Sequence, residues 1–153
     1  MTEWKSIDSE AALQAATEGN YYLTQDIVTM ETWKPNNNVV LCLNGHSIAA
    51  NGDFVVIEID KGQFTLCDCN SSESMHYFTT SKEGLFTRWV PCEENTENRI
   101  SVTGGVITHS VGRSDLGVKV DNNATFTMYG GTICGNKLQG SYNGAGVYVH
   151  NST

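Results

Sequence analysis

The feature that most constrains the fold of this chain is a short segment that the sequence repeats. The clearest copy is Phe126–Ile133, and weaker copies with similar apolar spacing are Leu41–Ile48, Phe64–Cys69 and Ile100–Ile107. The first residues of successive copies lie 23, 36 and 26 positions apart. A unit of this size is too small to bury its own apolar face, so neighbouring units must stack on one another. The sequence therefore predicts a repeat protein.

Apolar and polar residues alternate within the repeats. Phe126–Met128 and Val118–Val120 both run apolar, polar, apolar. A period of two is typical of half-buried strands and disfavours helical repeats. A second set of such strands is expected at Val55–Asp60, Gly117–Asn122 and Gly146–Asn151. Each repeat unit should thus carry at least two short strands.

Glycine and asparagine stand where the alternation stops, as at Gly104–Gly105, Asn122–Asn123 and Gly130–Gly131. These residues tolerate positive φ, so the chain can bend sharply there. Short strands, tight bends and a period in the twenties predict a chain that returns to its start and steps up by one strand spacing, about 4.8 Å. The predicted fold is all-β, a parallel β-helix. A propeller blade would need a longer period of about 40–45 residues.

Several segments also resemble a known family. They are Gly19–Thr24, Val40–Ile48, Leu66–Asn70, His76–Phe78 and the block Phe126–Asn136, and together they span most of the chain. They resemble right-handed parallel β-helix repeats in large surface proteins of gut-dwelling Gram-positive bacteria. The resemblance implies a right-handed single-stranded solenoid and a secreted or cell-surface location. It implies little about activity, because most members are adhesin-like or uncharacterised.

The two ends of the chain are expected to differ. Asp8–Glu18 is rich in alanine, begins with capping residues and is followed by Gly19, which predicts a short helix. We expect residues 1–20 to cap a β-helix spanning residues 21–153, with Leu43, Leu66, Val102 and Met128 stacked in one inward column. The last residues match a segment that continues further in the preceding copy, so the array is expected to be cut within a repeat. Self-association through the open C-terminal coil is then expected.

One segment, from about residue 70 to 98, departs from the repeat. Met75–Phe78 and Leu85–Val90 are β-prone runs joined through Thr79–Gly84, which predicts an inserted hairpin. Insertions in repeat proteins often carry specificity, and this one is rich in aromatic residues. Its candidate ligand-binding residues, for a glycan or a host protein, are Tyr77, Phe78, Phe86, Arg88 and Trp89. The alternative is that some of these rings only pack the hairpin against the rest of the domain.

The five cysteines, an odd number, cannot all be paired within one chain. They are Cys42, Cys67, Cys69, Cys92 and Cys134. A structural zinc site usually shows two paired groups of ligands at spacings of two to four residues, and the cysteines and histidines here are scattered. We therefore expect no metal site and no cofactor, and interpret the cysteines as small buried residues or as one disulfide.

No catalytic constellation is expected from the sequence. The aspartates Asp53, Asp60, Asp68, Asp115 and Asp121 are spread singly, and no serine or cysteine lies in a recognisable nucleophile elbow. A net charge of −8 argues against nucleic acid and anionic membranes, and no apolar run approaches the roughly 20 residues of a membrane span. The expected function is a structural or adhesive segment of a larger secreted or wall-attached bacterial surface protein. The alternative is a non-catalytic part of a carbohydrate-active lyase or hydrolase.

Overall fold

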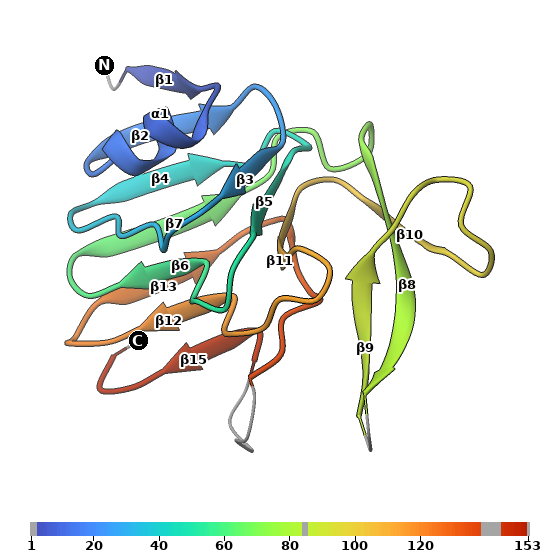
Figure 1. The fold of residues 1–153 in the computed structure, drawn as a ribbon. Coiled ribbons are helices and arrows are strands. Elements are labelled where there is room, and N and C mark those ends of the chain that lie inside the picture. Colours follow the sequence, from blue (N-terminus) through green and yellow to red (C-terminus); the bar gives the residue numbers. More distant parts are fainter. Residues whose placement is uncertain (1–2, 84–85, 139–144, 153) are drawn as a thin grey trace.

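The computed structural model describes residues 3–83, 86–138 and 145–152, and in these ranges the strands form four sheets (Figure 1). The first sheet is parallel, in the order β1 (Trp4–Ile7), β2 (Gly19–Leu23), β4 (Val39–Cys42), β7 (Gln63–Cys67) and β13 (Thr125–Met128). The second is parallel, in the order β14 (Thr132–Ile133), β11 (Val106–His109), β5 (Ser47–Ala50) and β3 (Ile27–Thr29). The third is parallel, with β15 (Val147–Val149), β12 (Val118–Val120) and β6 (Ile57–Ile59). The fourth, the hairpin sheet, is antiparallel, with β10 (Ile100–Thr103), β8 (Met75–Glu83) and β9 (Phe86–Pro91).

A single apolar core joins the three parallel sheets. Alternate residues of their strands are fully buried, among them Leu66 of the first sheet, Ile107 of the second and Val118 of the third. Trp33 is also fully buried, and its ring meets that of Phe64 edge-on at 5.5 Å between centroids. The period-two pattern thus buries one face of strands such as β6 and β12, whereas β11 is buried at all four positions.

The expected closed, right-handed parallel β-helix is wrong for the part of the chain that the structure describes. The strands form separate sheets of three to five strands and no closed solenoid. The N-terminal third of the chain adds no strand to the third sheet in the described structure and pairs with it through the isolated bridge Trp33↔Ile57. The hairpin sheet pairs only in the antiparallel sense. The alternation of apolar and polar residues therefore predicts the strands, but it does not predict how the strands are arranged into sheets.

The expected inward column of Leu43, Leu66, Val102 and Met128 is also wrong. Leu66 pairs with Leu41, not Leu43, because β4 ends before Leu43. Val102 lies in the hairpin sheet opposite His76. Met128 is the neighbour of Leu66 in the adjacent strand, but 41% of it is exposed.

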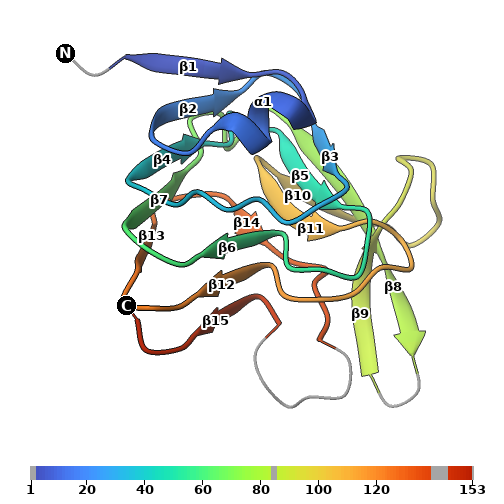
Figure 2. The ribbon, with the colours of Figure 1, turned by 60° about the vertical axis from the view of Figure 1, so that its left-hand side comes forward.

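The one described helix is α1 (Glu10–Ala15), shorter than the predicted Asp8–Glu18. Ser9 caps it by accepting a hydrogen bond from the backbone nitrogen of Ala12 at 3.1 Å, and Leu13 is its fully buried residue. Figure 2 shows α1 beside the strands at the N-terminal end of the domain. A helix of six residues is too short to cross a bilayer, and no described helix meets that requirement.

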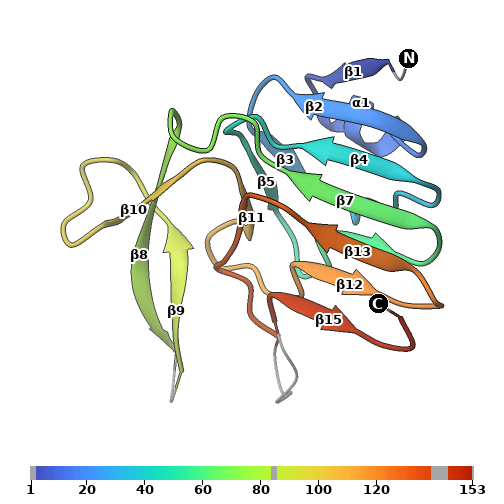
Figure 3. The same ribbon diagram turned by 180° about the vertical axis from the view of Figure 1, so that it is seen from behind.

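The inserted hairpin is present and larger than expected. Thr79–Glu83, predicted as part of the connection, continues β8 and pairs with β9, whereas Gly84 and Leu85 lie outside the described residues. Ile100–Thr103, predicted as a copy of the repeat, instead forms β10 and pairs with β8. Figures 1 and 3 show this sheet standing at one side of the parallel sheets. The insertion therefore extends through β10.

Candidate functional site

A groove of about 250 Å³ lies between the second sheet and the hairpin sheet. Its floor on the second sheet is made by residues of β5 and β11, namely Ser47, Ala49, Val106 and Thr108. The hairpin side is made by Met75–Phe78, Pro91 and Cys92, and Asp26 closes one end. In the register of the two strands Ser47 lies beside Val106 and Ala49 beside Thr108. Because Ser47 and Ala49 are small, they leave space between the two sheets.

The polar groups of the groove are held in place by the surrounding backbone. The Asp26 carboxylate accepts a hydrogen bond from the backbone nitrogen of Ser47 at 2.9 Å and lies 3.4 Å from Nδ1 of His46. Nε2 of His76 lies 2.9 Å from the carbonyl oxygen of Gly45. The Asp26 side chain is 56% exposed, so part of its hydrogen-bonding capacity faces solvent. The groove thus combines a carboxylate and hydroxyls with apolar walls.

Tyr77 is a predicted binding residue of the groove lining, but its ring is on the opposite face of β8 from His76 and Phe78. Its hydroxyl lies 3.2 Å from Oε1 of Glu94, and the Arg99 guanidinium lies 5.4 Å from its ring centroid. Loss of hydration and then the charge and hydrogen bond of Glu94 raise the pKa of Tyr77, with Arg99 acting in the opposite direction. Tyr77 therefore presents a neutral phenol.

The other predicted binding residues occupy different positions. Phe78 also lines the groove but is 99% buried, and its ring lies 6.2 Å from that of Trp89. Trp89 is 36% exposed and lies outside the groove lining. Arg88 donates from Nη1 to the carbonyl oxygen of Arg113 at 2.6 Å. The side chain of Phe86 lies outside the described residues.

The pairing of β8 with β9 explains this separation. Phe78 pairs with Pro91, and Thr80 with Trp89, so Phe78 and Trp89 share one face of the hairpin. Tyr77 belongs to the opposite face, because successive residues of a strand alternate. The aromatic residues therefore do not form one patch, and packing accounts for Phe78.

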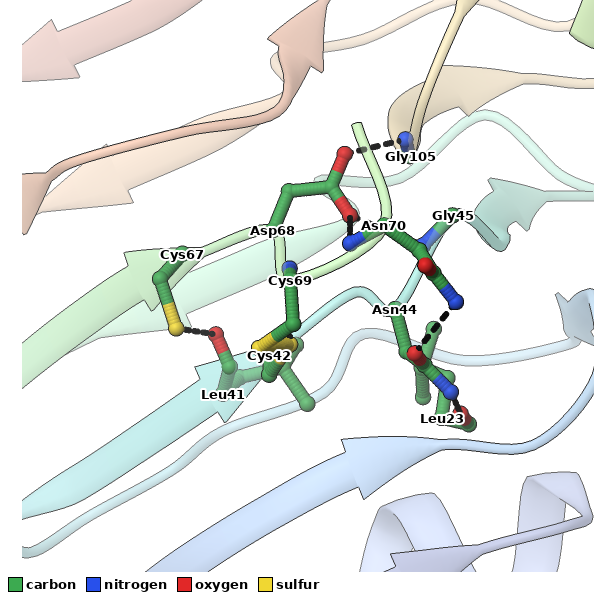
Figure 4. The surroundings of a disulfide bond; sticks show 10 residues. All are labelled: Leu23, Leu41, Cys42, Asn44, Gly45, Cys67, Asp68, Cys69, Asn70 and Gly105. Atoms are coloured by element: carbon green, nitrogen blue, oxygen red, sulfur yellow. Dashed lines mark hydrogen bonds between the residues drawn. A yellow bond between two sulfur atoms is a disulfide. The ribbon is translucent and has the colours of Figure 1, made fainter. Parts of the chain in front are cut away.

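A second cluster consists of three cysteines at the C-terminal ends of the neighbouring strands β4 and β7 of the first sheet (Figure 4). Cys42 at the end of β4 lies beside Cys67 at the end of β7, and Cys69 follows two residues later. Cys42 and Cys69 form a disulfide, and the sulfurs of all three residues lie within 4.8 Å of one another. Cys42 is buried, Cys67 is half-buried and Cys69 is exposed.

Asp68 braces the segment that carries two of these cysteines. Its Oδ1 accepts from the backbone nitrogens of Gly45 at 2.8 Å and Asn70 at 3.3 Å, and its Oδ2 accepts from that of Gly105 at 2.7 Å. Figure 4 shows the carboxylate turned away from the sulfurs toward these amides. Charge-assisted bonds of this kind fix a loop more firmly than neutral ones.

The free thiol of the cluster belongs to Cys67, whose Sγ lies 3.6 Å from the carbonyl oxygen of Leu41. Burial, and then the charge of Asp68, raise the pKa of Cys67. The thiol is therefore largely protonated at neutral pH, which slows its attack on the neighbouring disulfide.

Sequence reasoning missed this cluster because it considered spacing along the chain. Cys42 is 25 positions from Cys67 but directly beside it in the sheet. One sequence signal was present, since Leu41–Cys42 and Leu66–Cys67 repeat the same dipeptide. In the part of the chain that the structure describes, Cys42, Cys67 and Cys69 are the His, Cys, Asp or Glu residues whose potential metal-ligand atoms lie close together in a group of three. The five aspartates discussed above form no such group.

Comparisons with known proteins add no family. No protein-family model matches the chain, and neither a curated protein nor a solved structure matches it. The resemblance to bacterial surface repeats therefore stays an expectation, and the function must be argued from the geometry.

Proposed function

We propose that this domain is a non-catalytic binding module of a bacterial surface protein and that it holds one residue of a glycan in the groove between β5, β11 and the hairpin sheet. The observation that carries the proposal is the groove itself, with its small floor residues and its mixed lining. Its volume of about 250 Å³ lies just under the roughly 300–1,000 Å³ of small-molecule sites, which fits one unit of a chain rather than a large ligand.

The lining suits a sugar chemically. Pyranose rings have apolar C–H faces and many hydroxyls, and the groove offers apolar walls at Ala49 and Pro91 with acceptors at Asp26 and Ser47. His76 adds a polar ring, whose Nε2 lies 2.9 Å from the carbonyl oxygen of Gly45. The chain's net charge of −8 favours neutral or basic glycans over sulfated ones.

The test is a glycan array of host and dietary sugars, probed with the wild-type domain, His76→Ala and Trp89→Ala. Both substitutions remove a ring from the hairpin sheet, but only His76 is in the groove lining, on the face of β8 that carries Phe78. Loss of the His76 contact should weaken binding about tenfold, which corresponds to about 1.4 kcal/mol. Trp89→Ala should bind nearly as the wild type does.

An independent readout comes from Cys92, a free cysteine in the groove lining. A bound glycan should slow its alkylation, while Cys134, outside the groove, serves as the internal control in the same digest. The proposal fails if no glycan binds, or if His76→Ala binds unchanged and Cys92 gains no protection.

A further inference from the structure

We propose that Cys42, Cys67 and Cys69 form a redox-gated site for one Zn²⁺ ion, which binds when the Cys42–Cys69 disulfide is reduced. Three cysteine sulfurs lie within 4.8 Å of one another here. Zinc bonds to sulfur are about 2.3 Å long, so sulfurs at tetrahedral positions lie about 3.8 Å apart. Cys67 would therefore need to approach its two neighbours by at most about 1 Å, which a side-chain rotation supplies.

The backbone holds the three ligands in place independently of the disulfide. Cys42 and Cys67 end neighbouring strands in register, so the ladder of the first sheet sets their separation. The Asp68 hydrogen bonds to Gly45 and Gly105 fix the segment that carries Cys67 and Cys69. A site whose ligands are held by a folded framework needs little ordering when the metal binds.

The surroundings of Cys42 suit a thiolate ligand. The backbone nitrogen of Cys69 lies 3.1 Å from Sγ of Cys42, and an N–H donor at this position stabilises a thiolate. The Asp68 carboxylate is occupied by backbone amides. Cys69 is exposed, so the ion can enter from solvent, and a water molecule can take the fourth position.

The balance of the reaction makes the disulfide and the metal mutually exclusive. A dithiol reductant gives two electrons and two protons to the Cys42–Cys69 bond, which becomes two thiols, and the reductant leaves as its own disulfide. The three thiols then release three protons to bind Zn²⁺, and the resulting centre carries one negative charge. A small-molecule disulfide can take two electrons from Cys42 and Cys69 by thiol–disulfide exchange, leaving as two thiols after taking up two protons; the re-formed Cys42–Cys69 bond removes two of the three ligands and releases the ion.

The experiment uses the full chain reduced with a phosphine, which is then removed under anaerobic conditions. Cd²⁺ is titrated as a probe, because cadmium–thiolate bonds absorb in the ultraviolet, and Zn²⁺ is added in competition. The expected result is one Cd²⁺ per chain, displaced by Zn²⁺, with no binding to the disulfide form. The matched variants are Cys67→Ser within the cluster and Cys134→Ser, a free cysteine outside it.

Removal of a direct ligand should weaken binding at least about 100-fold in Cys67→Ser, whereas Cys134→Ser should bind as the wild type does. Cys69→Ser, at the exposed ligand, gives the same answer should Cys67→Ser fail to fold, as judged from its circular dichroism. The inference is overturned if the reduced wild type takes up no stoichiometric cadmium, or if the folded cluster variants bind as tightly as Cys134→Ser.

Discussion

His109 shows how a single buried residue ties distant segments together. It is 99% buried, yet Nδ1 lies 2.7 Å from Oδ1 of Asn136 and Nε2 lies 2.7 Å from the carbonyl oxygen of Phe54. The Asn136 amide nitrogen in turn donates to the carbonyl oxygen of Ile107 at 3.3 Å, which orients Oδ1 toward the imidazole. Both ring nitrogens thus lie within hydrogen-bonding distance of an oxygen.

We expect His109→Leu to lower the free energy of unfolding by about 1–3 kcal/mol, because it removes the buried ring that contacts two part-buried oxygens. Urea unfolding followed by circular dichroism measures this change. Val111→Ala, at a nearby residue that is 66% exposed, should change the stability by less than about 0.5 kcal/mol. Equal stabilities of the two variants would show that the His109 contacts contribute nothing.

Cys134 gives a second prediction at the scale of one residue. Burial raises its pKa from 9.0 to about 11. At pH 8 the folded protein should therefore hold about 100-fold less Cys134 thiolate than the unfolded chain, and iodoacetamide should alkylate it correspondingly more slowly. The rate in the folded protein should keep rising as the pH is raised toward 11, as long as the fold persists. Mass spectrometry of timed digests would contradict this if folded and urea-unfolded chains reacted equally fast.

At the scale of the element, the contact between the first and second sheets depends on a glycine without a side chain. A Cβ at Gly105 would lie 2.3 Å from Cβ of Leu43 and 2.8 Å from the carbonyl oxygen of His46. Leu43 is fully buried and His46 lies at the start of β5, so neither can move aside freely.

Gly105→Ala should consequently destabilise the domain by about 1–3 kcal/mol through overpacking. Gly146→Ala is the control, since its Cβ would meet only Cγ2 of Ile133 at 3.9 Å. Thermal unfolding of the two variants compares them directly. A Gly105→Ala midpoint equal to that of Gly146→Ala would mean that the sheets separate at no cost.

The elements also show which parts of the structure the sequence could predict. The strands of the third sheet follow from the sequence pattern: the predicted segments contain Ile57–Ile59, Val118–Val120 and Val147–Val149, which pair in register. The predicted bend at Asn122 and Asn123 is also present, with φ of 54° and 64°. Alternation specifies which residues of a strand are buried. It does not specify which strand will pair with which. The pattern therefore predicts Ile100–Thr103 as a copy of the repeat, although this segment pairs with β8 of the hairpin sheet.

The candidate sites were less predictable for the same reason. Neither the closeness of Cys42 to Cys67 nor the separation of Tyr77 from Trp89 follows from the local pattern, since both depend on strand register. The repeated Leu–Cys dipeptide was the local sign of the cysteine cluster. The groove has no sequence signal of its own, because it results from small residues on one sheet facing an insertion.

At the scale of the whole molecule, a rigid framework supports a projecting sheet. The three parallel sheets share one core, and the hairpin sheet stands at one side of them (Figure 1). The groove is lined by residues of the hairpin sheet and of the second sheet. The edge strands β13, β14 and β15 carry no further strand in the described structure, and 39% of Val147 and 50% of Val149 are exposed. Self-association through this edge stays a prediction.

The most direct measurement of the central claim is the affinity for the best glycan of the array, by isothermal titration calorimetry, after the groove has been filled. Ala49→Phe places a ring on the groove floor, and Val28→Phe places the same ring on the neighbouring strand, beside Ala49 but outside the groove. We expect Ala49→Phe to weaken binding at least about tenfold, or about 1.4 kcal/mol, and Val28→Phe to leave it unchanged. Unaltered binding by folded Ala49→Phe would contradict the account and place the ligand elsewhere.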